Sequence, residues 1–149
     1  MSPPVDPAIL AVVPHRPPML RVHQIVAANA QEVVVVGQEP TGPGALPWEL
    51  GAIEGLAQAA AVLLAQTMAE PTAPHGAPRG MLVSVKRFTI DAAPASGAEI
   101  TYHVRLVRRL GATALVTGHA EVAQHRLAGG ELTLWTARAE APRPPAGQT

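Results

Sequence analysis

The feature that most constrains this chain is one long apolar helix set among short patterned segments. The segment Trp48–Glu70 contains no proline and is dominated by Ala and Leu, which favours a single long helix. The segment Pro71–Arg79 carries three prolines and ends it. The small residues that would let strands pack closely around this helix are Ala57, Ala59, Ala60 and Ala61.

The remaining segments predict strands. Ahead of the helix, Leu20–Ala27 leads into Gln31–Gln38, whose run Val33–Val36 has the β-branched content of a buried strand. Beyond the helix, apolar and polar residues alternate with period two. The strands expected there are Gly80–Ile90, Glu99–Val107, Leu115–His125 and Glu131–Arg138, with turns at Pro94–Gly97 and Gly111 and a tight hairpin at Gly129-Gly130. One helix and one large antiparallel sheet make an α+β fold.

The length of 149 residues suits one domain spanning 1–149, with an ordered core over roughly residues 10–138. Pro3, Pro4 and Pro7 predict a loose start to the chain. The proline-containing tail Ala141–Thr149 is expected to be disordered.

The composition narrows the classes of function. Aromatic residues make up only 3%, so Val, Leu, Ile and Ala must fill the core, and the low charged fraction of 15% favours self-association into a homo-oligomer. The net charge is zero, so the chain has no overall positive charge that would indicate binding to nucleic acid or to an anionic membrane. The absence of cysteine excludes disulfides and zinc–thiolate sites and fits the cytoplasm. The apolar run Leu50–Met68 is interrupted by Glu54, Gln58 and Gln66, so no membrane span is expected.

Three segments resemble a known family. Pro14–Leu20 (Pro-His-Arg-Pro-Pro-Met-Leu) is similar to the Pro-His-Arg segment that leads into the first strand of the hotdog-fold 3-hydroxyacyl-carrier-protein dehydratases. Glu54–Ala60 (Glu-Gly-Leu-Ala-Gln-Ala-Ala) resembles the Glu-x-x-Ala-Gln start of that family's central helix, and Arg87-Phe88 resembles its Arg-Phe pair. The Pro-Pro-Met after His15 and the Trp48 before the helix look more like the dehydratase-like branch of aryl polyene gene clusters.

The resemblance covers roughly residues 10–138 and implies a hotdog fold, in which the sheet wraps around a central helix. It also implies a homodimer or higher oligomer with an acyl tunnel at the interface, and a thioester of acyl carrier protein or coenzyme A as the ligand. No cofactor is expected, because the thioester itself acidifies C2. One departure is clear: the stretch Gly37–Gly51 lacks the family's His-Phe-Pro-Gly histidine, and Glu49 stands where the family has a glycine.

Glu54 and His15 are the candidate catalytic residues. Dehydration needs one group to take a proton from C2 and another to protonate the leaving hydroxyl, and a carboxyl in an apolar tunnel suits that chemistry. The alternative for Glu54 is a first-turn residue that complements the helix dipole. His15 replaces the missing base if its loop reaches the helix start; otherwise it is structural.

Three residues are candidate substrate contacts. Gln58 lies one helical turn after Glu54 and either orients that carboxyl or a substrate carbonyl, or links helix to sheet as a satisfied buried amide. Trp48 and Gly51 lie at the helix start, where backbone N–H groups would polarise the thioester carbonyl.

The basic residues Lys86 and Arg87, with Arg105, Arg108 and Arg109, form a candidate patch for an acidic carrier protein; the alternative is ordinary charged strand edges. The spacing of His103, His119 and His125 fits no metal motif, and a solvated sheet face is expected.

Two other functions stay open. A hotdog thioesterase would use Glu54 to activate water or attack the carbonyl. A catalytically silent subunit would pair with an active dehydratase, and the absent His-Phe-Pro-Gly favours it.

Overall fold

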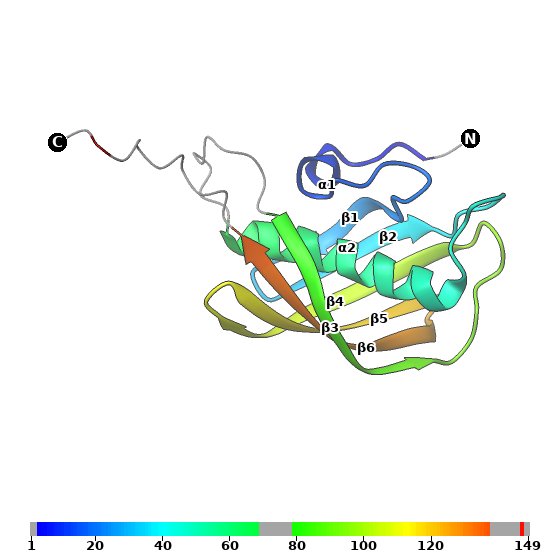
Figure 1. The fold of residues 1–149 in the computed structure, drawn as a ribbon. Helices are drawn as coiled ribbons and strands as arrows, with labels where there is room; N and C mark the ends of the chain where they lie inside the picture. The colour runs from blue at the N-terminus through cyan, green and yellow to red at the C-terminus, as the bar shows by residue number, and fades with distance from the viewer. Residues whose placement is uncertain (1–2, 69–78, 138–146, 148–149) are drawn as a thin grey trace.

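The computed structural model describes residues 3–68, 79–137 and 147 and has one long helix packed against a six-stranded sheet (Figure 1). Every strand pair is antiparallel, and the strand order is β1-β2-β4-β5-β6-β3. The elements are α1 (Pro7–Val12), β1 (Val22–Ala28), β2 (Glu32–Gln38), α2 (Trp48–Met68), β3 (Arg79–Ile90), β4 (Glu99–Leu110), β5 (Thr113–Val122) and β6 (His125–Ala137).

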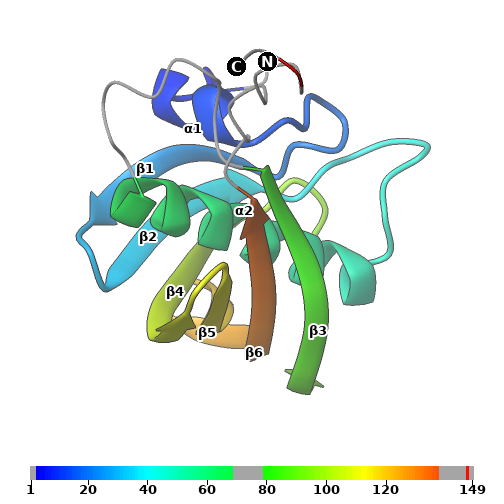
Figure 2. The ribbon, with the colours of Figure 1, turned by 60° about the vertical axis from the view of Figure 1, so that its left-hand side comes forward.

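The sheet curves around α2, which lies on its concave side (Figure 2). This arrangement confirms the expected α+β hotdog fold. Ala52, Ala59 and Ala60 on the helix have no exposed surface, so small side chains let strands approach it closely. Aliphatic residues dominate the core, and its largest fully buried members are Tyr102, Ile9, Leu56, Leu63, Leu64, Ile100 and Leu132.

Helix α2 is long and apolar enough to cross a membrane by length and composition alone, over Trp48–Gln66 with a mean hydropathy of 1.2. However, 61% of that window is buried inside the protein, as the core helix of a globular domain would be. Its apolar character therefore reflects the sheet that surrounds it.

The N-terminal segment is more ordered than its prolines indicate. The expected loose start is wrong from Pro7 onward, where α1 begins. Pro7 is well placed there because the first helical position needs no N–H donor, and the Ala8 N–H donates to Oδ1 of Asp6 at 2.9 Å. Ile9 and Val13 then bury their side chains in the core.

The expected hairpin at Gly129-Gly130 is also wrong. The β5–β6 turn is Ala123-Gln124, and both residues have positive φ (49° and 68°). The two glycines lie inside β6, where neighbouring strands leave no room for a side chain. A Cβ on Gly129 would come 2.7 Å from the Gly118 carbonyl oxygen, and one on Gly130 would come 2.8 Å from the Phe88 Cα.

The other expected strands are found close to their predicted positions, and β4 runs three residues further than expected, to Leu110. The expected loop Pro71–Arg79 lies outside the described residues up to position 78. The tail Ala141–Thr149 also lies outside them, apart from Gly147.

Candidate functional site

Glu54 lies in the second turn of α2, because the helix begins at Trp48. The first-turn carboxylate is Glu49, which is exposed and nearest the positive end of the helix dipole. The Glu54 side chain is 29% exposed, so it stands at the edge of the core. Its position is therefore less favourable for a purely dipolar role than that of Glu49.

The loop of His15 does reach this part of the helix. Nε2 of His15 lies 3.1 Å from Oε1 of Glu54. The loop is held by Arg16, whose guanidinium donates to the carbonyl oxygens of Leu10 and Val13 at 3.2 and 2.8 Å. The conformation that α1 imposes thus carries His15 to Glu54.

Gln58 contacts the same carboxylate oxygen as His15. Its Nε2 donates to Oε1 of Glu54 at 3.1 Å and to the Met19 carbonyl oxygen at 2.9 Å, and its Oε1 accepts from the Arg21 N–H at 2.8 Å. Gln58 is 2% exposed. Gln58 therefore contacts Glu54 and links the helix to residues 19–21, which precede β1, rather than to a strand of the sheet.

Trp48 and Gly51 pack inward at the helix start. Trp48 is 7% exposed, and the Gly51 N–H donates to the Pro47 carbonyl oxygen at 2.8 Å. A Cβ on Gly51 would come 2.6 Å from the Arg21 guanidinium, so this glycine makes room for a buried arginine.

A buried polar network beneath the helix was missed by the sequence analysis. Arg21 is 3% exposed and forms a close ion pair with Glu39, which is 8% exposed. Burial raises the pKa of the Glu39 carboxyl, and the neighbouring Arg21 opposes that rise. Burial also raises the pKa of the Tyr102 hydroxyl to about 12, again opposed by Arg21. Nothing in the local sequence distinguishes Arg21 or Glu39 from surface residues.

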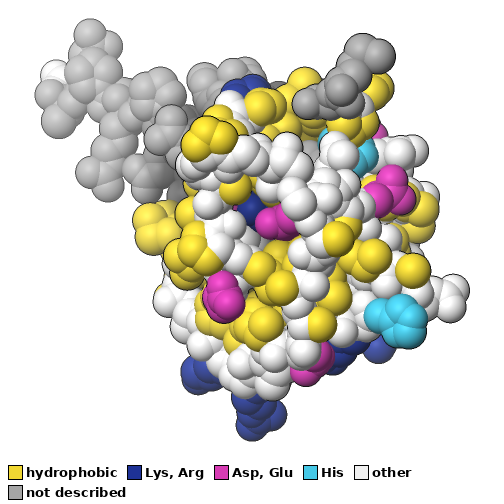
Figure 3. All heavy atoms as spheres, turned by 90° about the vertical axis from the view of Figure 1, so that its right-hand side faces the viewer, with side chains coloured by type: hydrophobic (Ala, Val, Ile, Leu, Met, Phe, Trp, Pro, Cys, Tyr) yellow, Lys and Arg dark blue, Asp and Glu magenta, His cyan; other side chains and the backbone are white. Residues whose placement is uncertain are grey.

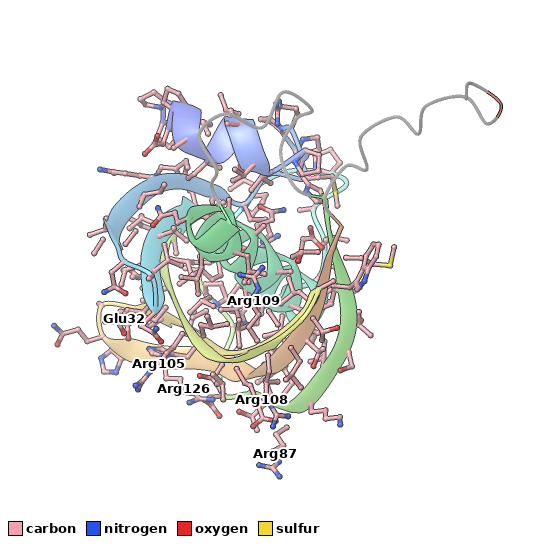
Figure 4. The ribbon with its side chains drawn as sticks, turned by 90° about the vertical axis from the view of Figure 1, so that its left-hand side faces the viewer. Glu32, Arg87, Arg105, Arg108, Arg109 and Arg126 are labelled. Carbon is pink, nitrogen blue, oxygen red and sulfur yellow. The ribbon has the colours of Figure 1, made fainter. Side chains whose placement is uncertain are left out.

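The expected carrier-protein residues lie elsewhere. Lys86 and Arg87 are exposed on β3, at the opposite edge of the sheet from β1. Arg87, Arg105 and Arg108 lie on the outer side of the sheet with Arg126, whereas Arg109 points to the concave side (Figure 4). The five basic residues therefore do not form one patch.

The outer face of the sheet also brings together two histidines that sequence spacing left apart. His103 and His119 are directly opposite each other on β4 and β5, with ring centroids 4.6 Å apart and planes 8° from parallel. Oε1 of Glu121 lies 2.9 Å from Nε2 of His103, and its Oε2 lies 3.4 Å from Nε2 of His119. The hydrogen bond from His103 lowers the pKa of Glu121, and burial lowers the pKa of His119.

The surroundings of Glu54 can support proton transfer. A carboxylate and an imidazole are in contact, and Gln58 and the backbone of residues 19–21 hold the carboxylate in place. Nδ1 of His15 is buried and has no hydrogen-bond partner among the described residues, so a bound ligand or water would satisfy it.

Hydrophobic side chains spread over the end of the molecule where α2 begins, and Lys and Arg gather toward its lower edge (Figure 3).

No protein-family profile and no curated protein sequence matches the chain. Several solved structures are similar to it. The dehydratase heterocomplex ApeI:P from Xenorhabdus doucetiae aligns with a TM-score of 0.73 at 18% identity, over 88% of this chain and 91% of that one. An HP0420 homologue from Helicobacter felis aligns at 0.64 and 10% identity, over 93% of each chain.

A hypothetical thioesterase with coenzyme A from Streptococcus pneumoniae aligns with a TM-score of 0.58 at 12% identity, over 76% of this chain and 84% of that one. At such identities these likenesses establish the hotdog fold.

Proposed function

We propose that this chain binds acyl thioesters and dehydrates 3-hydroxyacyl chains, with Glu54 and His15 as the catalytic pair. The observation that carries the proposal is the 3.1 Å contact between Nε2 of His15 and Oε1 of Glu54, which supplies an imidazole although the stretch Gly37–Gly51 has none. The likeness to a chain of a dehydratase heterocomplex supports the same reaction class.

The reaction needs two proton movements. His15 takes the proton from C2, the C2–H electron pair forms the C2=C3 double bond, and the C3–O electrons leave with the hydroxyl. Glu54 gives its proton to that hydroxyl, so water departs and an enoyl thioester remains. The proton on His15 then passes to Glu54 across their contact, which restores both groups.

The remaining site residues position the catalytic groups or bind the substrate and its carrier in this proposal. Gln58 keeps the Glu54 carboxylate in one orientation through its bonds to Met19 and Arg21. Trp48 and Gly51 shape the apolar helix start against which an acyl chain would lie. Lys86 and Arg87 are a proposed contact for an acidic carrier protein from the exposed face of β3.

A dimer through β3 completes the proposal. The Asp6 N–H donates to the His23 carbonyl oxygen at 2.7 Å, so the N-terminal segment covers part of the β1 edge. At the other edge, Met81 and Val83 on β3 are 62% and 59% exposed, and Trp135, opposite Met81 on β6, is 43% exposed. We call these three residues the β3 strip; its large apolar side chains favour a partner copy there.

The test offers 3-hydroxyacyl thioesters of acyl carrier protein and of coenzyme A to the untagged protein and follows both enoyl product and free thiol. Glu54→Gln should lower the rate of enoyl formation by about 10²- to 10⁴-fold, because it removes the acid and keeps the shape. His15→Gln should do the same. The matched controls are Glu49→Gln, the exposed carboxylate of the same helix, and His125→Gln, an exposed histidine on β6.

Enoyl formation that survives Glu54→Gln would overturn these roles. Thiol release in place of enoyl product would identify a thioesterase, which the likeness to a hypothetical thioesterase with coenzyme A also suggests.

A catalytically silent subunit is the second candidate. The missing His-Phe-Pro-Gly histidine favours it, as does the likeness to a heterocomplex. Neither product from the wild-type protein with either carrier, together with a rise in activity when an active dehydratase subunit is added, would support this second candidate.

A further inference from the structure

The histidine pair on the outer face of the sheet has the components of a metal site. His103 and His119 face each other across neighbouring strands, and Glu121 follows two residues after His119, so all three side chains share one face. Their ligand atoms all lie within 4.8 Å of one another. None of these three residues belongs to the His15–Glu54 pair.

The separations between the Glu121 oxygens and the two imidazoles are close to those in a small-cation site. Zn²⁺ binds imidazole nitrogen at about 2.0–2.1 Å and carboxylate oxygen at about 2.0–2.2 Å, so ligand atoms in a tetrahedral site are roughly 3.3 Å apart. The two contacts from Glu121, 2.9 and 3.4 Å, lie on either side of that separation. The two rings are nearly parallel, and the Nε2 atom of each contacts the Glu121 carboxylate.

The surroundings leave room for an ion with an open position. The side chains of His103, His119 and Glu121 are 35%, 38% and 22% exposed, so water can complete the coordination. Both histidines also line a cavity of about 490 Å³ on the outer face. Gly129 stands opposite His119 on β6, where a Cβ would come 2.7 Å from Nη2 of Arg126 and 2.9 Å from the Cβ of His119, so the Arg126 side chain borders this side of the site.

The arginines around this cavity stand beside carboxylates, which makes it a poor site for an anion. Arg126 pairs with Asp91 at 3.3 Å and Arg87 with Glu131 at 3.8 Å. Arg105 stands opposite Glu32 in the β2–β4 register, and Figure 4 shows both on the outer side. The positive charge of these arginines is therefore largely balanced by neighbouring carboxylates in the absence of a ligand.

We propose that His103, His119 and Glu121 bind a divalent transition-metal ion of the Zn²⁺ class, with one position left for water. Two imidazoles and one carboxylate are a donor set that suits such ions. The ion would link β4 to β5, so the melting temperature should rise as the free Zn²⁺ concentration increases above the dissociation constant.

The test titrates the untagged, chelator-treated full chain with Zn²⁺ by calorimetry, and with Co²⁺ by visible absorption, which reports nitrogen and oxygen ligands directly. One equivalent per chain is expected. Removing a ligand with His119→Asn or Glu121→Gln should weaken Zn²⁺ binding by at least the roughly 10–100-fold that loss of an outer-shell partner costs. Circular dichroism of the metal-free variants checks that they fold.

Two controls separate this site from other histidines. His125→Asn, an exposed histidine at the start of β6, should keep full binding. Glu54→Gln should keep it too, because it disrupts only the other histidine–carboxylate pair. Absence of Zn²⁺ binding to the wild type, or binding that folded His119→Asn and Glu121→Gln retain unchanged, would overturn the proposal.

Discussion

At the scale of single residues, one oxygen of Glu54 makes both of the contacts that hold its carboxyl group. Oε1 accepts from Gln58 and contacts His15, while both donors of the Gln58 amide are already used. In the proposed reaction, a substrate hydroxyl would therefore meet a carboxyl group whose orientation is set before binding. Such preorganisation lets a proton-transfer group act without first being reordered.

Tyr102 allows a direct test of the buried network, because it is the one tyrosine in the chain. Burial raises the pKa of Tyr102 to about 12, so tyrosinate absorbance should appear near pH 12 in the folded protein and near 10 after unfolding in urea. Between these values the unfolded chain binds fewer protons, so the free energy of unfolding should fall as pH rises from about 10 to 12.

Tyr102→Phe is the control for that titration. It should abolish the absorbance change and remove this part of the alkaline loss of stability, which circular dichroism would follow. A midpoint near 10 in protein that circular dichroism shows to be folded would contradict the burial of the hydroxyl.

The sequence predicted part of this residue-scale picture. The pairing of Glu54 with Gln58 follows from their spacing on a helix. The approach of His15 depends on the path of its loop. Hydrogen bonds from Arg16 to the carbonyl oxygens of Leu10 and Val13 hold that path, and no residue pattern in the sequence indicates them. The Arg21–Glu39 pair joins residues 18 positions apart, so it was missed for the same reason.

At the scale of elements, α2 and β4 approach closely because Gly55 faces Tyr102. A Cβ on Gly55 would come 2.4 Å from the ring. Gly55→Ala should therefore lower the free energy of unfolding by about 1–3 kcal/mol through overpacking, although alanine favours a helix by about 1 kcal/mol. Urea denaturation measures the balance.

A double-mutant cycle isolates the cause of that loss. In a Tyr102→Leu background the ring is gone, so Gly55→Ala should cost less than in the wild type or become stabilising. Equal costs in both backgrounds would show that the clash with Tyr102 is not responsible.

Strand positions were predicted well and turns less well, for a physical reason. Alternation in Glu99–Val107 follows directly from one buried face, since Ile100, Tyr102 and Val104 point into the core. The turn at Ala123-Gln124 uses residues without a turn signature. Gly129 and Gly130 carry that signature, but they lie inside β6, where neighbouring strands leave no space for a side chain.

At the scale of the whole molecule, the two edges of the sheet differ. The N-terminal segment lies along β1, whereas β3 presents the exposed β3 strip. Val83→Lys should place a charge in the proposed dimer contact and convert a species of twice 15.4 kDa to one of 15.4 kDa in light scattering. The apolar, low-charge composition predicts self-association, and the edge proposed for it depends on the strand order.

Val26→Lys is the matched control, because Val26 is 58% exposed on β1 at the other edge. It should leave the mass unchanged. A wild-type protein that is monomeric at micromolar concentration would contradict the dimer and remove the interface tunnel with it.

The two tryptophans of this chain sit in opposite surroundings, Trp48 at 7% exposure beside the helix start and Trp135 at 43% exposure on the β3 strip. Their fluorescence should accordingly divide into a blue-shifted emission that resists acrylamide quenching and a red-shifted emission that is readily quenched. Ligand capture near α2 would perturb the first signal, and subunit pairing through β3 would perturb the second. The native protein thus carries separate optical reporters for both events without any added dye.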